Sequence, residues 1–253
     1  MKQRYHTIMV VLLMLAMVTQ SCEKNGELAV LPIEKLSPVA FKGFVMKDTL
    51  EQYFDGVKMR EFYGQAKFEG NIAFQGEAPV KMELRKKNTG EVLYTHTIER
   101  SDPNTQPISF FYDGQKITEK YQYPGAIANM EQIAFYFDFP ANMPVDIAYG
   151  DGSDVNAVEY LARNVKPGEW TEFIKVPPLE GEMYVLLLKA GKKEYIMDND
   201  VNYSYMSAGL TLPNKYGYQG GGVQSWYVGR RHDATLNKPV LDPQIDLVAI
   251  FPR

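Results

Sequence analysis

The sequence predicts an all-β protein built as two antiparallel β-sandwich domains in tandem. Apolar and polar residues alternate over many short stretches, which is the pattern of half-buried strands. Turn residues interrupt these stretches about every ten residues, as in β-sandwiches. Aromatic residues make up 13% of the 253 residues and the chain has a single cysteine. Aromatic side chains favour strands, and they supply a core that needs no disulfide bond.

An export signal occupies residues 1–21. A basic start precedes an apolar stretch at residues 8–18, and Cys22 follows. The stretch suits a signal core and is too short for a permanent membrane span, which needs about 20 residues. The segment resembles a bacterial lipoprotein signal of the Bacteroidales type, in which a small residue such as Ser21 precedes the modified cysteine.

This resemblance implies that Cys22 is lipidated and tethers the mature protein to the outer membrane. The sequence does not decide between the periplasmic face of that membrane and the face toward the cell exterior. Each buried CH₂ of an acyl chain contributes about 0.8 kcal/mol to such anchoring. Residues 22–40 would be the anchor and a short tether that leads into an edge strand, and Pro32 and Pro38 discourage regular structure there. The alternative is an ordinary cleaved signal with an incidental free thiol.

The charge of the mature chain excludes one class of partner. Removing the signal takes away Lys2 and Arg4, which leaves 25 basic and 31 acidic residues and a net charge of −6. A mildly acidic protein lacks the basic face that nucleic acids need. We therefore expect no nucleic-acid partner. No sequence motif calls for a cofactor.

Residues 41–122 are expected to form the N-terminal β domain. Residues 68–74 alternate between two faces, with Phe68, Gly70, Ile72 and Phe74 on one and Glu69, Asn71 and Ala73 on the other. Residues 80–98 repeat the pattern on both sides of a turn, which predicts a β-hairpin. Residues 108–112 are a further expected strand. Residues 50–62 fit either a pair of strands or one helical turn.

Residues 126–253 are expected to form the C-terminal β-sandwich domain. Its first strand should bury the odd positions of residues 133–139. Turns rich in glycine, proline and lysine separate the strands that follow. The expected strands are residues 133–139, 145–149, 157–165, 170–176, 183–188, 194–197 and 245–251.

Part of this second domain resembles a known family. Residues 144–152 read Pro-Val-Asp-Ile-Ala-Tyr-Gly-Asp-Gly. They are similar to the "PVDVYVDG" strand and turn of an uncharacterised bacterial secreted β-sandwich domain. The segments that follow keep that domain's order, and the whole resemblance covers residues 129–198. The resemblance implies export and a sandwich, and we expect domains of the immunoglobulin/transthyretin-like kind. The family has no catalytic motif to transfer.

The best candidate for ligand binding is the glycine-rich aromatic segment at residues 213–227. Its candidate residues are Tyr216, Tyr218, Trp226 and Tyr227, whose flat apolar faces and polar tips suit sugars or peptides. The alternative is that Trp226 and one tyrosine fill the end of the sandwich, because aromatic side chains mostly serve core packing.

No metal site or catalytic residue is predicted. The acidic loops at residues 151–154 and 198–200 lack the spacing of a calcium loop, and Asx turns explain them. His96 should lie on a solvent-facing side of its strand, and His232 follows two arginines. Serine-elbow, zinc-protease and phosphate-loop motifs do not occur in the sequence. We therefore expect no enzymatic activity.

The leading hypothesis is a non-catalytic lipoprotein of the cell envelope that acts in binding or presentation. Its partner would be a glycan or another envelope protein, contacted through residues 213–227. The second hypothesis is a structural subunit of a pilus or adhesin, assembled by strand addition at sheet edges. A hydrolase is the third, because paired carboxylates or a serine–histidine–acid site can be built from distant residues.

Overall fold

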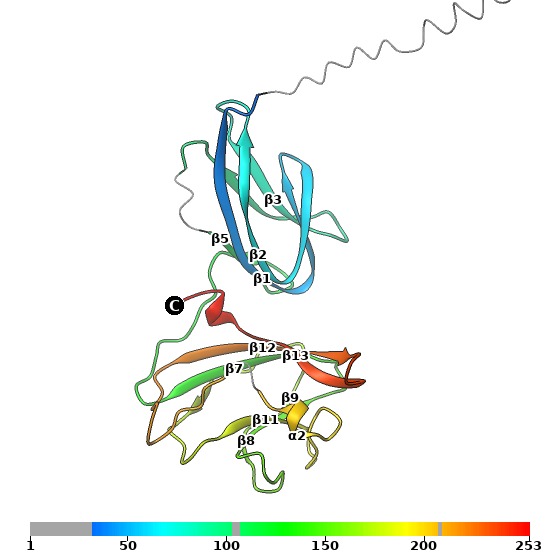
Figure 1. Ribbon diagram of the computed structural model, residues 1–253, viewed down its shortest axis with the longest axis vertical. Helices are drawn as coiled ribbons and strands as arrows, with labels where there is room; N and C mark the ends of the chain where they lie inside the picture. The colour runs from blue at the N-terminus through cyan, green and yellow to red at the C-terminus, as the bar shows by residue number, and fades with distance from the viewer. Residues whose placement is uncertain (1–31, 103–106, 207–208) are drawn as a thin grey trace, which may run out of the picture.

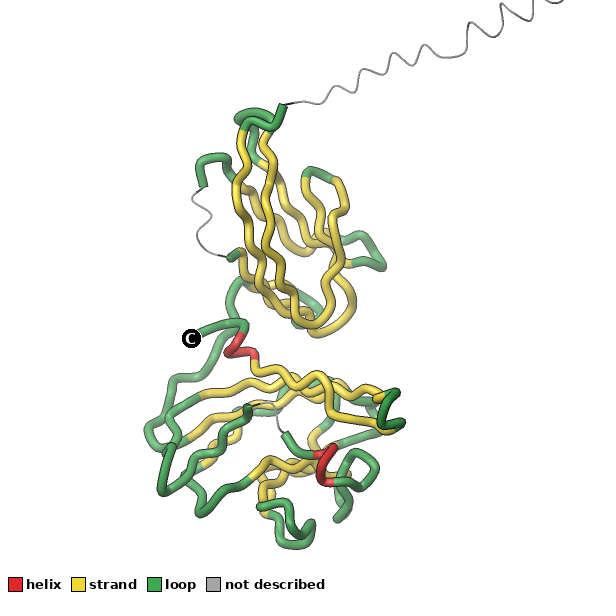
Figure 2. Tube along the Cα trace, viewed as in Figure 1, coloured by secondary structure: helices red, strands yellow, loops and turns green. Residues whose placement is uncertain are grey.

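The computed structural model describes residues 32–102, 107–206 and 209–253, and nearly all regular structure in them is β-strand (Figure 2). The prediction of an all-β, sandwich-like fold is confirmed. The expected signal and Cys22 lie outside the described residues. Within the described ranges, no helix is long and apolar enough to cross a membrane.

The first six strands form one sheet (Figure 1). Its path is β4-β3-β1-β5-β6, and β2 pairs with the other side of β1. The strands are β1 (Lys35–Phe54), β2 (Val57–Phe74), β3 (Val80–Lys86), β4 (Val92–Ile98), β5 (Ile108–Tyr112) and β6 (Ile117–Thr118).

The long hairpin of β1 and β2 organises this sheet. Its turn is Asp55-Gly56, and both residues have positive φ angles, 47° and 81°, as tight hairpin turns require. Residues 50–62, which the sequence left open, are therefore a strand pair. A register shift after Val45 divides β1, so that its first part pairs with β5 and its last part with β3.

The expected alternation places one face of this sheet in a core. In β2, Ile72 and Phe74 are buried while Asn71 and Ala73 are exposed. The predicted hairpin is confirmed as β3 and β4, with Val80 opposite Ile98. The expected irregular structure at Pro38 is wrong, because Pro38 lies in β1. Proline is tolerated there since β5 does not reach it, and only β2 pairs with that part of β1.

The remaining strands form two sheets that pack face to face as a sandwich. One sheet has the order β10-β7-β12-β13 and the other β11-β8-β9. The strands are β7 (Glu131–Asp138), β8 (Val145–Gly150), β9 (Glu159–Val165), β10 (Ile174–Val176), β11 (Tyr184–Lys189), β12 (Val223–Asp233) and β13 (Lys238–Asp246).

The sequence predicts antiparallel pairing throughout, but two of the described strand pairs are parallel. β1 runs parallel to β5, and β7 runs parallel to β12. Parallel neighbours need a long crossover, and residues 139–222 supply one between β7 and β12. All three strands of the second sheet lie within that crossover, so the chain completes one layer of the sandwich before it returns to the other.

Three expected strands differ from the structure. Residues 245–251 are not a strand, because β13 ends at Asp246 and the 3-10 helix η1 (Leu247–Ala249) follows. Asp246 causes the break, since its carboxylate accepts the backbone N–H of Val248 and caps the turn. The strand expected at 170–176 is reduced to β10, and residues 194–197 make only an isolated bridge. The short helix α2 (Val201–Ser204) was not predicted.

An aromatic cluster joins the first sheet to the sandwich. Phe44 and Phe111 of the first sheet pack with Tyr136 and Tyr227 of the sandwich and with Phe251 near the C-terminus. This explains why β7 is buried on both faces and not only at its odd positions. The domain limits expected at residues 122 and 126 stay a prediction.

Candidate functional site

An open groove of about 970 Å³ lies beside the aromatic cluster. Four parts of the chain line it: β4, residues 102 and 107–109 around the start of β5, the connection around residues 119–126, and the C-terminal residues 250–253. Its aromatic lining includes Tyr94, His96, Tyr121 and Tyr123. We call it the tyrosine groove. Its volume is at the upper end of the range for small-molecule sites, about 300–1,000 Å³.

β4 supplies a flat platform to the groove. Tyr94 and His96 are two residues apart, so the strand projects both from the same face. Their ring centroids are 6.3 Å apart and the ring planes differ by 15°. The Tyr94 O–H donates to Oε1 of Glu119 at 2.9 Å. Burial, together with this hydrogen bond, raises the pKa of Tyr94 above its ordinary value, so the hydroxyl stays a neutral donor.

Tyr121 and Tyr123 form a second wall. Their rings meet edge to face with centroids 4.9 Å apart, and Tyr121 also stacks on Phe251 at 6.3 Å. The Tyr123 O–H donates to the backbone carbonyl of Phe251 at 3.0 Å. Burial raises the pKa of both tyrosines. These contacts fix the connection between the sheets against the C-terminus, so the groove is rigid on this side.

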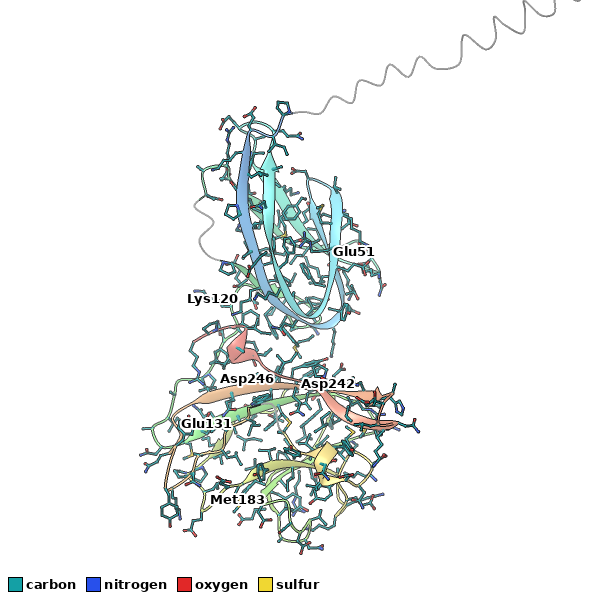
Figure 3. The ribbon with its side chains drawn as sticks, viewed as in Figure 1. Glu51, Lys120, Glu131, Met183, Asp242 and Asp246 are labelled. Atoms are coloured by element: carbon teal, nitrogen blue, oxygen red, sulfur yellow. The ribbon has the colours of Figure 1, made fainter. Side chains whose placement is uncertain are left out.

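The charged groups of the groove have both signs. Glu119 and Asp102 stand against Lys120 and Arg253, and Figure 3 shows Lys120 between the first sheet and the sandwich. The Arg253 guanidinium donates to the carbonyl of Val223, and Glu119 accepts from Tyr94. The groove therefore offers apolar ring faces beside donors and acceptors, without an excess of one charge.

Of the four ligand-binding candidates predicted at residues 213–227, two are buried and two are exposed. Trp226 is 2% exposed and lies in the core of the sandwich, where its Nε1–H donates to Oε1 of Gln224 at 3.0 Å. Tyr227 is 7% exposed, stacks on Tyr136 and donates its O–H to Asp138 at 2.6 Å. Both rings are covered by the protein itself, because β12 buries both of its faces.

The other two candidates, Tyr216 and Tyr218, are at the surface, 85% and 47% exposed. Their loop is held by the buried carboxylate of Glu131, which accepts the Tyr218 O–H at 2.7 Å and the Gly222 N–H at 2.9 Å. A Cβ atom on Gly222 would lie 2.4 Å from Glu131 Oε1, so any other residue here would have to displace the carboxylate. The ring of Tyr216 remains free to meet a ligand.

Sequence reasoning missed the tyrosine groove. Part of the signal was present, because alternation in residues 92–98 places Tyr94 and His96 on one face of a strand. That Tyr121 and Tyr123 meet this face depends on the packing of the chain after β6, which has no local pattern. Arg253 lines the groove because the C-terminal residues return beside it, and no local sequence feature indicates that position.

The acidic loops serve turns and caps. The carboxylate of Asp151 accepts the backbone N–H and the hydroxyl of Ser153, and Asp200 caps α2 by accepting the N–H of Asn202. In the described part of the chain, no three acidic, histidine or cysteine residues gather as metal ligands would. The carboxylates of Asp151, Asp154 and Asp200 are thus occupied by local donors.

Comparison with known proteins shows no family. No family model matches the chain, and no curated protein matches it. One solved structure with a weak likeness is described as "Alpha-glucan binding by a streptococcal virulence factor". It is 13% identical with a TM-score of 0.21, and the alignment covers 76% of this chain and 93% of that chain. A TM-score this low carries no argument about fold or ligand.

Proposed function

We propose that this protein is a non-catalytic carbohydrate-binding protein of the cell envelope, and that the tyrosine groove receives the glycan. The observation that carries the proposal is the groove itself. It has about 970 Å³ of open space, and the rings of Tyr94, His96 and Tyr121 line it beside hydrogen-bonding groups. A sugar ring has one apolar C–H face and a rim of hydroxyls. Aromatic faces with polar neighbours match both parts.

The charges of the groove favour a neutral glycan. Glu119 and Asp102 balance Lys120 and Arg253, so an anionic polymer would gain nothing overall from the groove. The neutral Tyr94 hydroxyl and the exposed carboxylate of Glu119 are suited to bind sugar hydroxyls. We therefore expect a neutral polysaccharide to bind better than a polyuronate.

The export signal and lipidated Cys22 complete the proposal, because they would hold the groove at the outer membrane. Acyl chains anchor the N-terminus only. The groove is built from β4, the residues around the start of β5, residues 119–126 and the C-terminal residues. A lipid on Cys22 is therefore compatible with an open groove.

Affinity gel electrophoresis tests this function. A soluble form that starts at Glu23 keeps every described residue. It would be run through gels that contain soluble α-glucans, β-glucans, xylan, galactomannan or polygalacturonate. We expect at least one neutral polysaccharide to retard it. Tyr94→Ala should weaken that binding about 5- to 30-fold, the equivalent of about 1–2 kcal/mol for the contact area of one ring face.

Tyr216→Ala is the matched control, because it removes an exposed tyrosine from the 213–222 loop and leaves the groove intact. We expect it to bind like the unaltered protein. Loss of retardation in Tyr216→Ala alone would move the site to that loop and overturn the groove. The groove is also refuted if the whole panel fails to retard the protein. Release of reducing ends from a retained polysaccharide would refute the non-catalytic part.

A further inference from the structure

The outer edge of β2 is long and regular. Among the described residues, β2 pairs with β1 and with no other strand. Its residues 65–74 continue without a register shift, from Gln65 opposite Phe44 to Phe74 opposite Lys35. The backbone groups on the far side of this segment are free to pair with another strand.

This part of the edge has only one of the usual kinds of protection. Natural sheets protect their edges with charged side chains, above all lysine, or with proline, bulges, inward-pointing charges or a covering loop. Residues 65–74 contain no proline, and their charged side chains are Lys67 and Glu69 alone. These two side chains are 72% and 73% exposed, and Lys67 Nζ lies 3.8 Å from Glu69 Oε1. Both point into solvent and hold each other only loosely.

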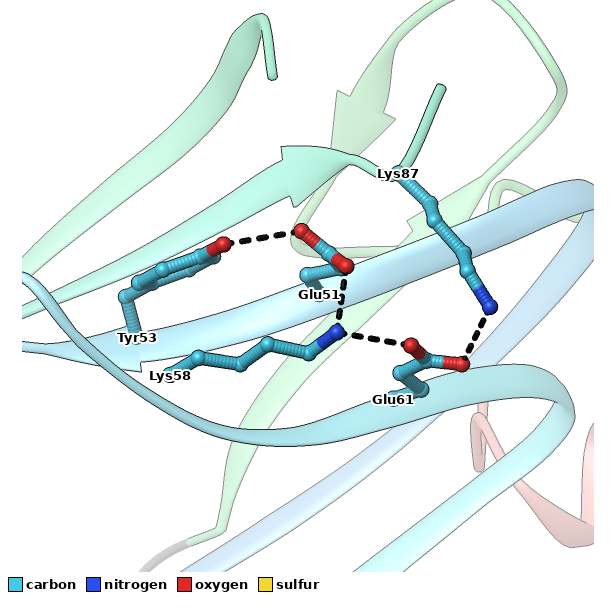
Figure 4. Close-up of polar contacts among 5 residues, drawn as sticks. All are labelled: Glu51, Tyr53, Lys58, Glu61 and Lys87. Atoms are coloured by element: carbon cyan, nitrogen blue, oxygen red, sulfur yellow. Dashed lines mark hydrogen bonds and ion pairs between the residues drawn. The ribbon is translucent and has the colours of Figure 1, made fainter. Parts of the chain in front are cut away.

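The beginning of β2 is different, because its charges are already paired within the chain (Figure 4). Lys58 contacts Glu51 and lies 2.7 Å from Glu61, and Lys87 lies 2.8 Å from the other oxygen of Glu61. An irregular stretch opposite Tyr63 then separates this cluster from residues 65–74. The unsatisfied part of the edge is therefore the second part of β2.

The sequence of that part is complementary to itself. If a second copy pairs antiparallel with Phe68 opposite Phe68, then Lys67 lies opposite Glu69 of the second copy, and Glu69 opposite its Lys67. A shift of one copy by two residues places Lys67 opposite Lys67 or Glu69 opposite Glu69, and like charges in such positions destabilise a sheet. A shift by one residue would place the inner face of one strand beside the outer face of the other.

We propose that two copies of this chain pair edge to edge through residues 65–71 of β2, antiparallel and with a twofold axis at Phe68. The ring of Phe68 is half-buried and carries the Arg60 guanidinium 3.2 Å from its centroid. In the pair, this ring would meet its own copy on the inner face. The interface uses no residue of the tyrosine groove, so it is independent of the proposed function.

Sedimentation velocity of the soluble form that starts at Glu23 tests the interface. The concentration would run from about 1 µM to 1 mM, which spans the Kd range of weak specific pairing. We expect a monomer–dimer equilibrium. Lys67→Glu alone, or Glu69→Lys alone, should weaken the dimer at least about tenfold, because two attractive pairs become repulsive.

The two variants also test the register. Mixed in equal amounts, the Lys67→Glu and Glu69→Lys proteins should form a heterodimer, because each opposed pair is again of opposite sign. The double variant that exchanges both charges should regain the homodimer. Both positions are exposed, and unchanged circular dichroism would show that the variants fold. A protein that stays monomeric to 1 mM, or single variants that dimerise as well as the unaltered chain, would overturn the proposal.

Discussion

Glu131 should be a critical residue for the 213–222 loop, and Glu131→Ala tests this. The side chain is 2% exposed on β7 (Figure 3). Its carboxylate accepts the Tyr218 O–H at 2.7 Å, the Gly222 N–H at 2.9 Å and a Gln224 Nε2–H at 2.7 Å. One buried group therefore ties the loop to the centre of the sandwich.

The structure gives the size of the effect. After Glu131→Ala, the N–H of Gly222 and one N–H of Gln224 would be buried without an acceptor. Each such group costs about 1–3 kcal/mol. Tyr218 is half-exposed and can turn its hydroxyl to water. The free energy of unfolding should therefore fall by about 2–6 kcal/mol, which corresponds to a fall in Tm of about 5–20 °C for a chain of this size.

Guanidinium unfolding followed by circular dichroism measures this change, and Glu180→Ala is its control. Glu180 also holds the loop, through an ion pair with Lys215 at 2.6 Å, but its side chain is 72% exposed. An exposed pair of this kind contributes about 0–1 kcal/mol. If Glu131→Ala were no more damaging than Glu180→Ala, the assignment of the buried carboxylate as the anchor of the loop would be refuted.

Three further changes have expected directions. Gln52→Met should stabilise the fold by about 1–2 kcal/mol, because both polar atoms of the Gln52 amide are buried with no partner among the described residues; a lower denaturation midpoint would contradict this. Burial raises the pKa of Asp246 above 3.8, so this carboxyl favours the folded state while protonated, and that contribution is lost as the pH rises through the folded-state pKa. Asp246→Asn should therefore stabilise the protein at about pH 7 and not at about pH 3, and equal shifts at both pH values would argue against it. Trp226→Ala should cost about 3–5 kcal/mol and the exposed Tyr216→Ala less than about 0.5 kcal/mol, so equal unfolding curves for the two would contradict their assigned burial.

The hairpins could be predicted because each has one buried and one exposed face. In β3 and β4 the alternation was sufficient to find both strands and their turn, and the structure adds the register, with Val80 opposite Ile98. β12 was missed for the opposite reason. Residues 223–229 are all buried, since one face packs in the sandwich and the other against the first sheet. A strand covered on both faces has no alternation to detect.

The candidate site was less predictable than the fold. Trp226 and Tyr227 were singled out by composition, but their exposure depends on which layers cover β12. Tyr94 and Tyr121 are brought together only when the connection after β6 folds back beside β4. Contacts between distant segments leave no local trace in one sequence, so a site of this kind becomes visible only in three dimensions.

The most direct test of the proposed function is to map where a glycan touches the protein. Two-dimensional NMR spectra of the soluble form that starts at Glu23 would be recorded with oligosaccharides cut from the polysaccharide that retards it. We predict that the changed signals belong to residues 94–96, 119–126 and 250–253. Changes confined to residues 213–222, or spread without a cluster, would contradict binding in the tyrosine groove.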